Sequence, residues 1–216
     1  MVVSGGDGGV AGGTGGRDQA GAGGGAGKGT LSTRQAHVAV AWIRQAEIMV
    51  RGVDRPEDAA ALMEAATVIA IGPGLGLDAW GRGLLDAALA TGEPMVVDAD
   101  ALTLIAGQAD IGTADWVLTP HPGEAGRLLG VSAGDIQQDR FAALDSLSAR
   151  YGGTVLLKGL GTLVQGEPVD AGPVRSLIRD GNPGMASGGM GDVLTGVIAA
   201  LRAQGLNGFD AARLGA

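Results

Sequence analysis

The chain contains no cysteine among its 216 residues. Disulfide bonds, thiolate zinc sites and a cysteine nucleophile are therefore excluded. Only two histidines are present, which disfavours a zinc site built from imidazoles. A cysteine-free composition agrees with a cytoplasmic location, and this is the location we expect.

Aromatic residues and clustered positive charge are also scarce. Aromatics make up 3% of the chain, the net charge is −8, and the lysines and arginines are scattered. Nucleic-acid binding depends on basic patches and aromatic stacking platforms, so we expect no nucleic-acid partner. No apolar run reaches the ~18 residues of a membrane span, and the first residues do not resemble a signal peptide. We therefore expect no membrane partner.

Glycine, in contrast, is abundant. Fourteen of the 42 glycines lie in the first 30 positions, and residues 5–29 form a low-complexity segment without helical or strand periodicity. Composition alone predicts a flexible leader there. The rest of the chain is regular, and a hydrophobic content of 45% fits one domain with a sizeable core. The chain stops within a helical pattern, so we expect a single domain over residues 1–216 that lacks a C-terminal portion.

Short apolar runs alternate with helical patterns after residue 30. Strands are expected at 67–71, 95–98, 116–119, 154–158, 162–165 and 174–178. Helices are expected at 37–46, 54–66, 78–90, 101–106, 139–151 and 191–204, with another closed by Gly130. This alternation predicts an α/β fold, a doubly wound and mainly parallel sheet with helices on both faces.

Polar and glycine-rich segments follow the ends of the expected strands. The carboxyl edge is where open α/β sheets bind their ligands. We therefore expect one crevice to collect Gly74, Asp98, His121, Lys158 and the Gly188–Asp192 loop.

The loop before the last long helix carries the strongest chemical signal. Gly188, Gly189, Met190 and Gly191 form an expected anion loop, because unpaired amides at a helix start attract a phosphate. Asp192 would repel that phosphate, which points to a base aimed at a hydroxyl that attacks phosphorus. The alternative is a glycine turn in which Asp192 only complements the helix dipole, worth about 0.3–1 kcal/mol.

No Walker A lysine follows this loop, so a nucleotide must be held elsewhere. The segment Lys158, Gly159, Leu160, Gly161 and Thr162 is the candidate, with the Lys158 cation and the turn amides contacting a phosphate. The alternative is a lysine that simply emerges into water at a strand end.

Three further positions leave alternatives open. His121, held between two prolines, either contacts a substrate or caps the next helix. Asp98 and Asp100 either hold magnesium through water or cap a helix. The Gly72–Gly76 turn allows close approach of its backbone to a ligand or to a neighbouring helix.

In this order, the motifs resemble the ADP-dependent NAD(P)H-hydrate dehydratases of the ribokinase-like superfamily. The resemblance is carried by Ile71–Gly76, Val97–Leu102, Leu118–Glu124, Leu157–Gly159 with Gly161–Thr162, and Asn182–Ala186 with Gly189–Asp192. It implies a ribokinase-like fold and the ADP-driven dehydration of (6S)-NADHX and NADPHX to NADH and NADPH, with release of AMP and phosphate. Magnesium is the implied ion, ADP the implied phosphoryl donor, and a homotetramer the implied assembly.

The same resemblance implies roles for individual residues. Residues matching Gly74 or Gly76, His121 and Asp192 contact the hydrated nicotinamide, and Asp192 is the catalytic base. Those matching Lys158 to Thr162, and Gly191, contact the adenine nucleotide. No protein residue is assigned to a metal.

The N-terminal segment departs from the family. Gly13 stands where the family has an alanine that contacts the substrate. The interior glycines of this stretch each cost a helix about 0.5–1 kcal/mol relative to alanine, which predicts a weakened first helix. Two other functions remain open: a small-molecule (vitamin-precursor) kinase of the same superfamily, and a non-catalytic nucleotide-binding remnant. The preferences for ADP over ATP and for NADHX over NADPHX are also open.

Overall fold

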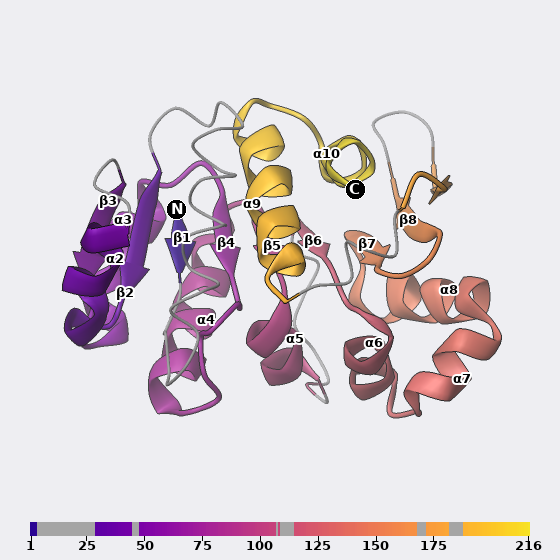
Figure 1. The fold of residues 1–216 in the computed structure, drawn as a ribbon, viewed down its shortest axis with the longest axis horizontal. Helices are drawn as coiled ribbons and strands as arrows, with labels where there is room; N and C mark the ends of the chain where they lie inside the picture. Colours follow the sequence, from indigo (N-terminus) through magenta and orange to yellow (C-terminus); the bar gives the residue numbers. More distant parts are fainter. Residues whose placement is uncertain (4–28, 45–47, 107, 109–114, 168–171, 182–187) are drawn as a thin grey trace.

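The computed structural model describes residues 1–3, 29–44, 48–106, 108, 115–167, 172–181 and 188–216. Within them, one nine-stranded sheet runs across the molecule (Figure 1). Its strands are β1 (Val2–Val3), β2 (Thr30–Thr33), β3 (Met49–Gly52), β4 (Ile69–Ile71), β5 (Met95–Val97), β6 (Trp116–Leu118), β7 (Thr154–Leu157), β8 (Thr162–Gly166) and β9 (Val174–Ile178). The helical segments are η1 (Gln35–His37), α2 (Val38–Arg44), η2 (Pro56–Ala59), α3 (Ala60–Glu64), α4 (Ala79–Thr91), α5 (Ala99–Ile105), α6 (Pro122–Leu129), α7 (Ala133–Gln138), α8 (Arg140–Tyr151), α9 (Met190–Ala203) and α10 (Gly208–Gly215).

The strand order is β3-β2-β1-β4-β5-β6-β7-β8-β9. All neighbours from β3 to β7 pair in parallel, whereas β8 and β9 are antiparallel. The order reverses between β1 and β4, which makes the sheet doubly wound. This confirms the expected mainly parallel sheet, and such a switch point is where these sheets open a crevice for ligands.

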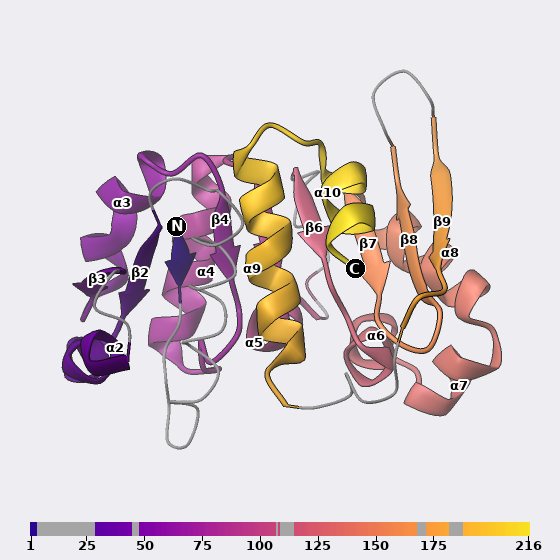
Figure 2. The same ribbon diagram turned by 45° about the horizontal axis from the view of Figure 1, so that its top comes forward.

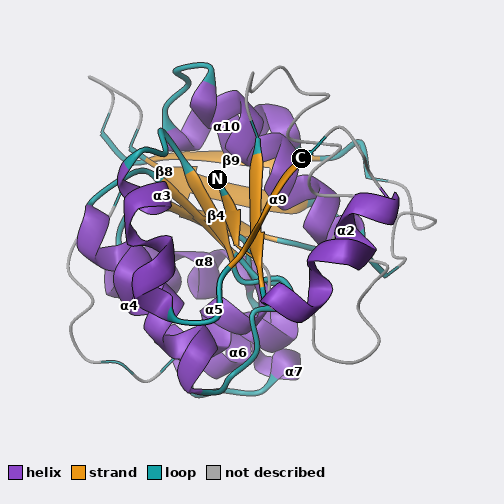
Figure 3. Cartoon of the chain, turned by 90° about the vertical axis from the view of Figure 1, so that its left-hand side faces the viewer, coloured by secondary structure: helices purple, strands orange, loops and turns teal. Residues whose placement is uncertain are grey.

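Alternate residues of the central strands face two separate hydrophobic clusters. In β4, Ile69 and Ile71 pack in the larger cluster and Ala70 in the other. Helices α3, α4, α5, α6 and α8 cover the larger face, and α9 and α10 cover the opposite face. Figures 2 and 3 show α9 crossing the middle of the sheet on the side away from α4 and α5. Helices on both faces are therefore confirmed.

Most expected elements are present, with ends shifted by a few residues. The expected helix at 54–66 starts at Pro56, with Arg55 as its N-cap, and the Arg55 amide donates to Asp58 Oδ2 at 3.2 Å. Strands β2 and β3 and helix α7 are not among the expected elements, because each is short and polar at half or more of its positions. The glycine-rich stretch lies outside the described residues except for Gly29, and so does Gly13.

Helix α4 shows how local sequence fixes an element. Asp78 accepts a hydrogen bond from the Gly81 amide at 3.0 Å, and Gly92 ends the helix with φ 69°. The Gly81 amide, followed by Arg34, holds the pKa of Asp78 below its ordinary value.

None of the helices in the described part of the chain is long and apolar enough to cross a membrane.

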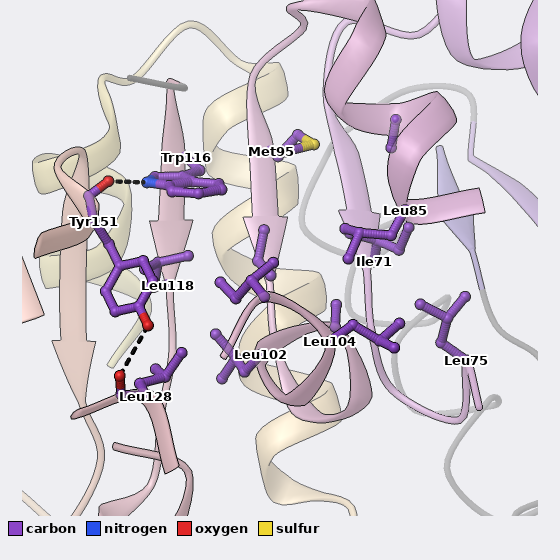
Figure 4. Close-up of a cluster of buried hydrophobic side chains, with 14 of the residues drawn as sticks. Ile71, Leu75, Leu85, Met95, Leu102, Leu104, Trp116, Leu118, Leu128 and Tyr151 are labelled. Atoms are coloured by element: carbon purple, nitrogen blue, oxygen red, sulfur yellow. Dashed lines mark hydrogen bonds between the residues drawn. The ribbon is translucent and has the colours of Figure 1, made fainter. Parts of the chain in front are cut away.

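The larger cluster contains a polar clamp between β6, α8 and α6 (Figure 4). The buried Trp116 indole donates to the carbonyl of Tyr151 at 3.2 Å, and the Tyr151 hydroxyl donates to the carbonyl of Leu128 at 2.9 Å. Burial raises the pKa of Tyr151. Both aromatic polar atoms are therefore satisfied inside the core, as buried indole and phenol groups require.

Replacing Tyr151 with phenylalanine should lower the free energy of unfolding by about 1 kcal/mol at neutral pH. The substitution keeps the ring but leaves the Leu128 carbonyl without its donor. Urea denaturation measures the change. An unchanged midpoint would contradict the clamp.

The same variant should differ in its response to alkaline pH. A folded-state pKa raised by burial gives stability that is fully present below the unfolded value of about 10 and lost as pH rises through the folded value. The wild type should therefore lose more stability than Tyr151→Phe above pH ~10. Phe141→Leu, at a half-exposed position on the same helix, serves as the control.

Candidate active site

The candidate site lies at the carboxyl ends of four adjacent strands. The Gly72–Gly76 turn follows β4, Asp98 follows β5, His121 lies just after β6, and Lys158 follows β7. These strands pair in parallel, with Ile71 opposite Val97 and Val97 opposite Leu118. The expected gathering of these segments at one sheet edge is thus present.

Asp98 is the centre of this cluster. Its side chain is 2% exposed, its Oδ1 accepts from Lys158 Nζ at 2.8 Å, and its Oδ2 accepts from Thr195 Oγ1 at 3.0 Å. These bonds join the end of β5 to the end of β7 and to the first turns of α9. Asp98 stands at the N-cap of α5 but makes no side-chain capping bond, so the interpretation of this carboxylate as a helix cap is wrong.

The backbone beside Asp98 is strained. Ala99 has φ 48°, and among the described residues it is the one non-glycine residue with a left-handed φ. Such a conformation costs a residue with a Cβ roughly 1–2 kcal/mol. It persists because the surrounding bonds hold the Asp98 carboxylate in place, a pattern typical of functional sites.

Lys158 does not emerge into water, contrary to the alternative interpretation. Its side chain is 19% exposed, and Nζ lies 2.8 Å from Asp98 Oδ1 and 3.7 Å from Glu124 Oε2. An ammonium carries three donors, so these partners leave Lys158 able to contact an anion as well. A Cβ added to Gly191 would lie 3.3 Å from Lys158 Nζ, which places the start of α9 directly against this cation.

His121 caps α6. Its Nδ1 accepts from the amides of Gly123 at 2.9 Å and Glu124 at 3.3 Å, while Glu124 Oε2 accepts from the His121 amide at 2.8 Å. With Nδ1 as the acceptor, Nε2 of the neutral ring carries the proton. The side chain is 49% exposed, and its Nε2 lies 3.5 Å from Glu124 Oε1. The interpretation of His121 as a helix cap is therefore confirmed, and its contact with a substrate stays a prediction.

The turn after β4 packs on the same edge. The Gly76 amide donates to Asp100 Oδ2 at 2.9 Å, so this carboxylate ties the turn to α5. A Cβ on Gly72 would lie 1.7 Å from the Asp98 carbonyl oxygen. The close backbone approach that the sequence predicts for this turn therefore occurs, at Gly72, between this turn and the backbone of Asp98.

The anion loop meets α9 as expected, with the helix starting one residue earlier. Gly189 is the N-cap with φ 93°, Met190 is the first helical residue, and Asp192 lies in the first turn. Gly188 and Gly189 are exposed. The preceding residues 182–187, which carry part of the family motif, lie outside the described residues.

Thr195 is a site residue that was not predicted from the sequence. Its position three residues after Asp192 was a possible signal, because residues at that spacing share a helix face. In the structure, the buried residues of α9 include the polar Thr195 and Arg202 as well as the apolar Ile198.

The sheet order, the helices on both faces and the polar cluster at the carboxyl edge define a ribokinase-like α/β protein. An adenosine kinase from Sinorhizobium meliloti shares this fold, with a TM-score of 0.64 and 16% identity over 93% of this chain and 73% of that one. At that identity the likeness concerns the fold alone.

The model of the NAD(P)H-hydrate dehydratase family matches residues 1–216, and the chain belongs to this family. It is similar to an ADP/ATP-dependent NAD(P)H-hydrate dehydratase from Bacillus subtilis, co-crystallised with ATP/Mg2+ and soaked with CoA. The TM-score is 0.82, with 26% identity over 99% of this chain and 77% of that one.

Two sequence relatives are closer in identity. A bifunctional NAD(P)H-hydrate repair enzyme Nnr of Coxiella burnetii is 46% identical over 88% of this chain and 38% of the relative. An ADP-dependent (S)-NAD(P)H-hydrate dehydratase of Neisseria meningitidis is 41% identical over 68% of this chain and 50% of the relative. The chain thus spans half or less of the length of these two relatives.

Replacing Asp98 with asparagine should lower the free energy of unfolding by about 3 kcal/mol, because it removes the nearer counter-charge of the Lys158 ammonium and leaves only Glu124 at 3.7 Å in a poorly solvated site. Thr195→Val removes one hydrogen bond to the carboxylate and should cost less, about 1.5 kcal/mol. Urea denaturation at neutral pH measures both.

Asp145→Asn provides the matched control. Asp145 pairs with Arg175, and the two side chains are 46% and 49% exposed. Exposed ion pairs contribute little, so this change should stay within about 0.5 kcal/mol of wild type. An equal loss in Asp98→Asn and Asp145→Asn would show that Asp98 has no special role.

Proposed function

We propose that this chain catalyses the ADP-dependent dehydration of (6S)-NADHX and NADPHX, yielding NADH or NADPH, AMP and phosphate. The observation that carries the proposal is the contact between Lys158 and the start of α9, the helix whose first turn contains Asp192. A cation thus lies against a helix start whose first turn carries a carboxylate, and these are the three kinds of group that phosphoryl transfer to a hydroxyl requires. Family membership and the activity named for the Neisseria relative support the same reaction.

The first chemical step forms a phosphate ester. Asp192 accepts the proton of the substrate's ring hydroxyl, whose oxygen attacks the β-phosphorus of ADP. The bond from this phosphorus to its bridging oxygen breaks, and AMP leaves. Gly188 to Gly191 place backbone amides near the equatorial oxygens, and Lys158 offsets negative charge on the nucleotide.

The second step removes phosphate. The ring nitrogen donates its electron pair as the carbon–oxygen bond breaks, and phosphate departs with the former hydroxyl oxygen. Loss of a proton from the neighbouring ring carbon then restores the dihydropyridine. The sum is the loss of one water from the substrate, coupled to hydrolysis of ADP to AMP and phosphate.

The nicotinamide substrate lies, in this proposal, between His121 and the turn that contains Gly74 and Gly76. His121, whose side chain is 49% exposed, contacts the substrate from the start of α6. Gly13 is proposed to belong to the same subsite. The nucleotide lies along Lys158, Gly159, Leu160, Gly161 and Thr162, with Gly191 closing its phosphate end.

Magnesium is proposed to accompany the nucleotide. Among the described residues no group of three or more His, Cys, Asp or Glu side chains could hold a metal ion, and Asp98 and Asp100 are engaged by protein donors. Magnesium needs few protein ligands when phosphate oxygens and water complete its shell. The residues present therefore fit an ion that is held mainly by the nucleotide and that neutralises phosphate charge.

A homotetramer in the cytoplasm, in which each subunit contains one ribokinase-like domain over residues 1–216, completes the proposal. The tetramer rests on the family resemblance, and the location on the cysteine-free composition. Size-exclusion chromatography with light scattering gives the oligomeric mass directly.

Purified protein incubated with NADHX should regenerate NADH in the presence of ADP, followed by the rise in NADH absorbance. Turnover with ATP in place of ADP sets the donor preference. A vitamin-precursor kinase would consume ATP without forming NADH. A non-catalytic remnant would gain thermal stability from ADP but show no turnover.

Asp192→Asn should lower kcat by about a hundredfold to ten-thousandfold, because it removes the base while keeping its shape. The Kd for ADP, measured by titration calorimetry, should change by no more than about threefold, since the nucleotide contacts remain. Near-normal turnover would contradict the role of Asp192.

Asp210→Asn is the matched control. Asp210 also occupies the first turn of a helix, α10, where its amide donates to the Asn207 cap. Removal of its charge tests the general effect of losing a first-turn acid. The kcat and the ADP affinity of Asp210→Asn should equal those of the wild type.

A further inference from the structure

Arg140, the first residue of α8, makes an unusual set of contacts behind the candidate nucleotide segment. Its Nη1 donates to the carbonyls of Leu160 at 2.5 Å and Gly161 at 2.9 Å. Its Nη2 donates to the carbonyls of Leu157 at 3.1 Å and Lys158 at 3.4 Å. One guanidinium therefore contacts four carbonyls of a five-residue stretch.

These bonds fix the direction of the loop amides. In a trans peptide the N–H points opposite to the C=O of the same unit. The carbonyls of Lys158 and Leu160 face Arg140, so the amides of Gly159 and Gly161 point away from it. The Lys158 amide confirms this geometry, because it donates to the Pro120 carbonyl at 2.9 Å while the Leu157 carbonyl accepts from Arg140.

The direction away from Arg140 leads toward the proposed phosphate site. Helix α8 covers the larger cluster face of the sheet, whereas α9 covers the opposite face. The Lys158 side chain reaches the start of α9, where a Cβ on Gly191 would lie 3.3 Å from its Nζ. Arg140 and the anion loop therefore lie on opposite sides of the nucleotide segment.

The absence of a side chain at Gly159 leaves room for the Arg140 guanidinium. Gly159 has φ 149°, and a Cβ there would lie 3.0 Å from Arg140 Nη2. Leu160, at the tip, is 82% exposed, so solvent and not core packing surrounds the turn. Hydrogen bonds from a cation are about twice as strong as neutral ones, which makes Arg140 the main restraint on these carbonyls.

We propose that Arg140 is a positioning residue for ADP, which acts by turning the Gly159 and Gly161 amides toward the nucleotide phosphates. It does not touch the ligand. This inference rests on the proposed function only in taking ADP as the ligand of this loop. Lysine cannot replace the residue, because an ammonium cannot reproduce the planar fork that spans four carbonyls.

The test compares Arg140→Lys, Arg140→Gln and Gly159→Ala with wild type. All three should raise the Kd for ADP about tenfold or more, measured by calorimetry without the second substrate. In turnover assays KM for ADP should rise with it, while KM for NADHX and kcat at saturating ADP stay within about threefold. Arg150→Lys and Arg150→Gln, at an exposed position on the same helix, should leave all constants unchanged.

Three outcomes would overturn the inference. An ADP Kd within about twofold of wild type in Arg140→Lys shows that the loop keeps its amides in place without the fork. An equal rise in both KM values shows a general loss of structure. A Kd for ADP that rises in Arg140→Gln but not in Arg140→Lys shows that ADP binding needs only the positive charge at this position.

Failure of the proposed function is distinguishable. Wild-type protein that binds ADP but does not dehydrate NADHX contradicts the reaction, and the calorimetric comparison of the variants still decides the role of Arg140. If Arg140→Gln does not fold, Arg140→Lys and Gly159→Ala carry the comparison. Wild-type protein that binds no ADP contradicts both proposals.

Discussion

The Asp98 carboxylate, with Lys158 on one oxygen and Thr195 on the other, is the constraint on which the rest of the candidate site depends. A carboxylate that is 2% exposed is costly to bury unless each oxygen finds a partner. The hydrogen bonds from Lys158 and Thr195 that satisfy these oxygens fix the ends of β5 and β7 and the start of α9 relative to one another. The strained Ala99 backbone beside it is tolerated for the same reason.

Helices from both faces of the sheet lie against the Lys158–Thr162 segment. On one face, Arg140 at the start of α8 holds the carbonyls of the Lys158–Thr162 segment. On the other, the start of α9 meets the Lys158 side chain. The strands of the sheet between them are buried on both faces. A reaction between two bound ligands requires their reacting atoms to be held about 3–3.5 Å apart, and a well-packed sheet supports such positioning.

Much of this arrangement was predictable from the sequence. The apolar runs that end in glycine or polar residues identified β4 to β7, and their order implied that Asp98, His121 and Lys158 would share an edge. Local patterns do not reveal which side chains bond across that edge. The Asp98–Thr195 bond spans 97 residues and the Arg140–Leu160 bond spans 20, and neither leaves a periodic signal. Strand β2 was missed because Leu31 is its one apolar residue, and β3 because its apolar residues Met49 and Val50 are followed at once by Arg51 and Gly52.

The central chemical claim is that the substrate hydroxyl attacks the β-phosphorus of ADP. NADHX labelled with 18O at the ring hydroxyl tests it directly, with the products of a single turnover analysed by mass spectrometry. In the proposed reaction the labelled oxygen becomes part of the phosphate ester and leaves with it, so the inorganic phosphate should carry the label. Label recovered in water, with unlabelled phosphate, would contradict phosphoryl transfer to the substrate.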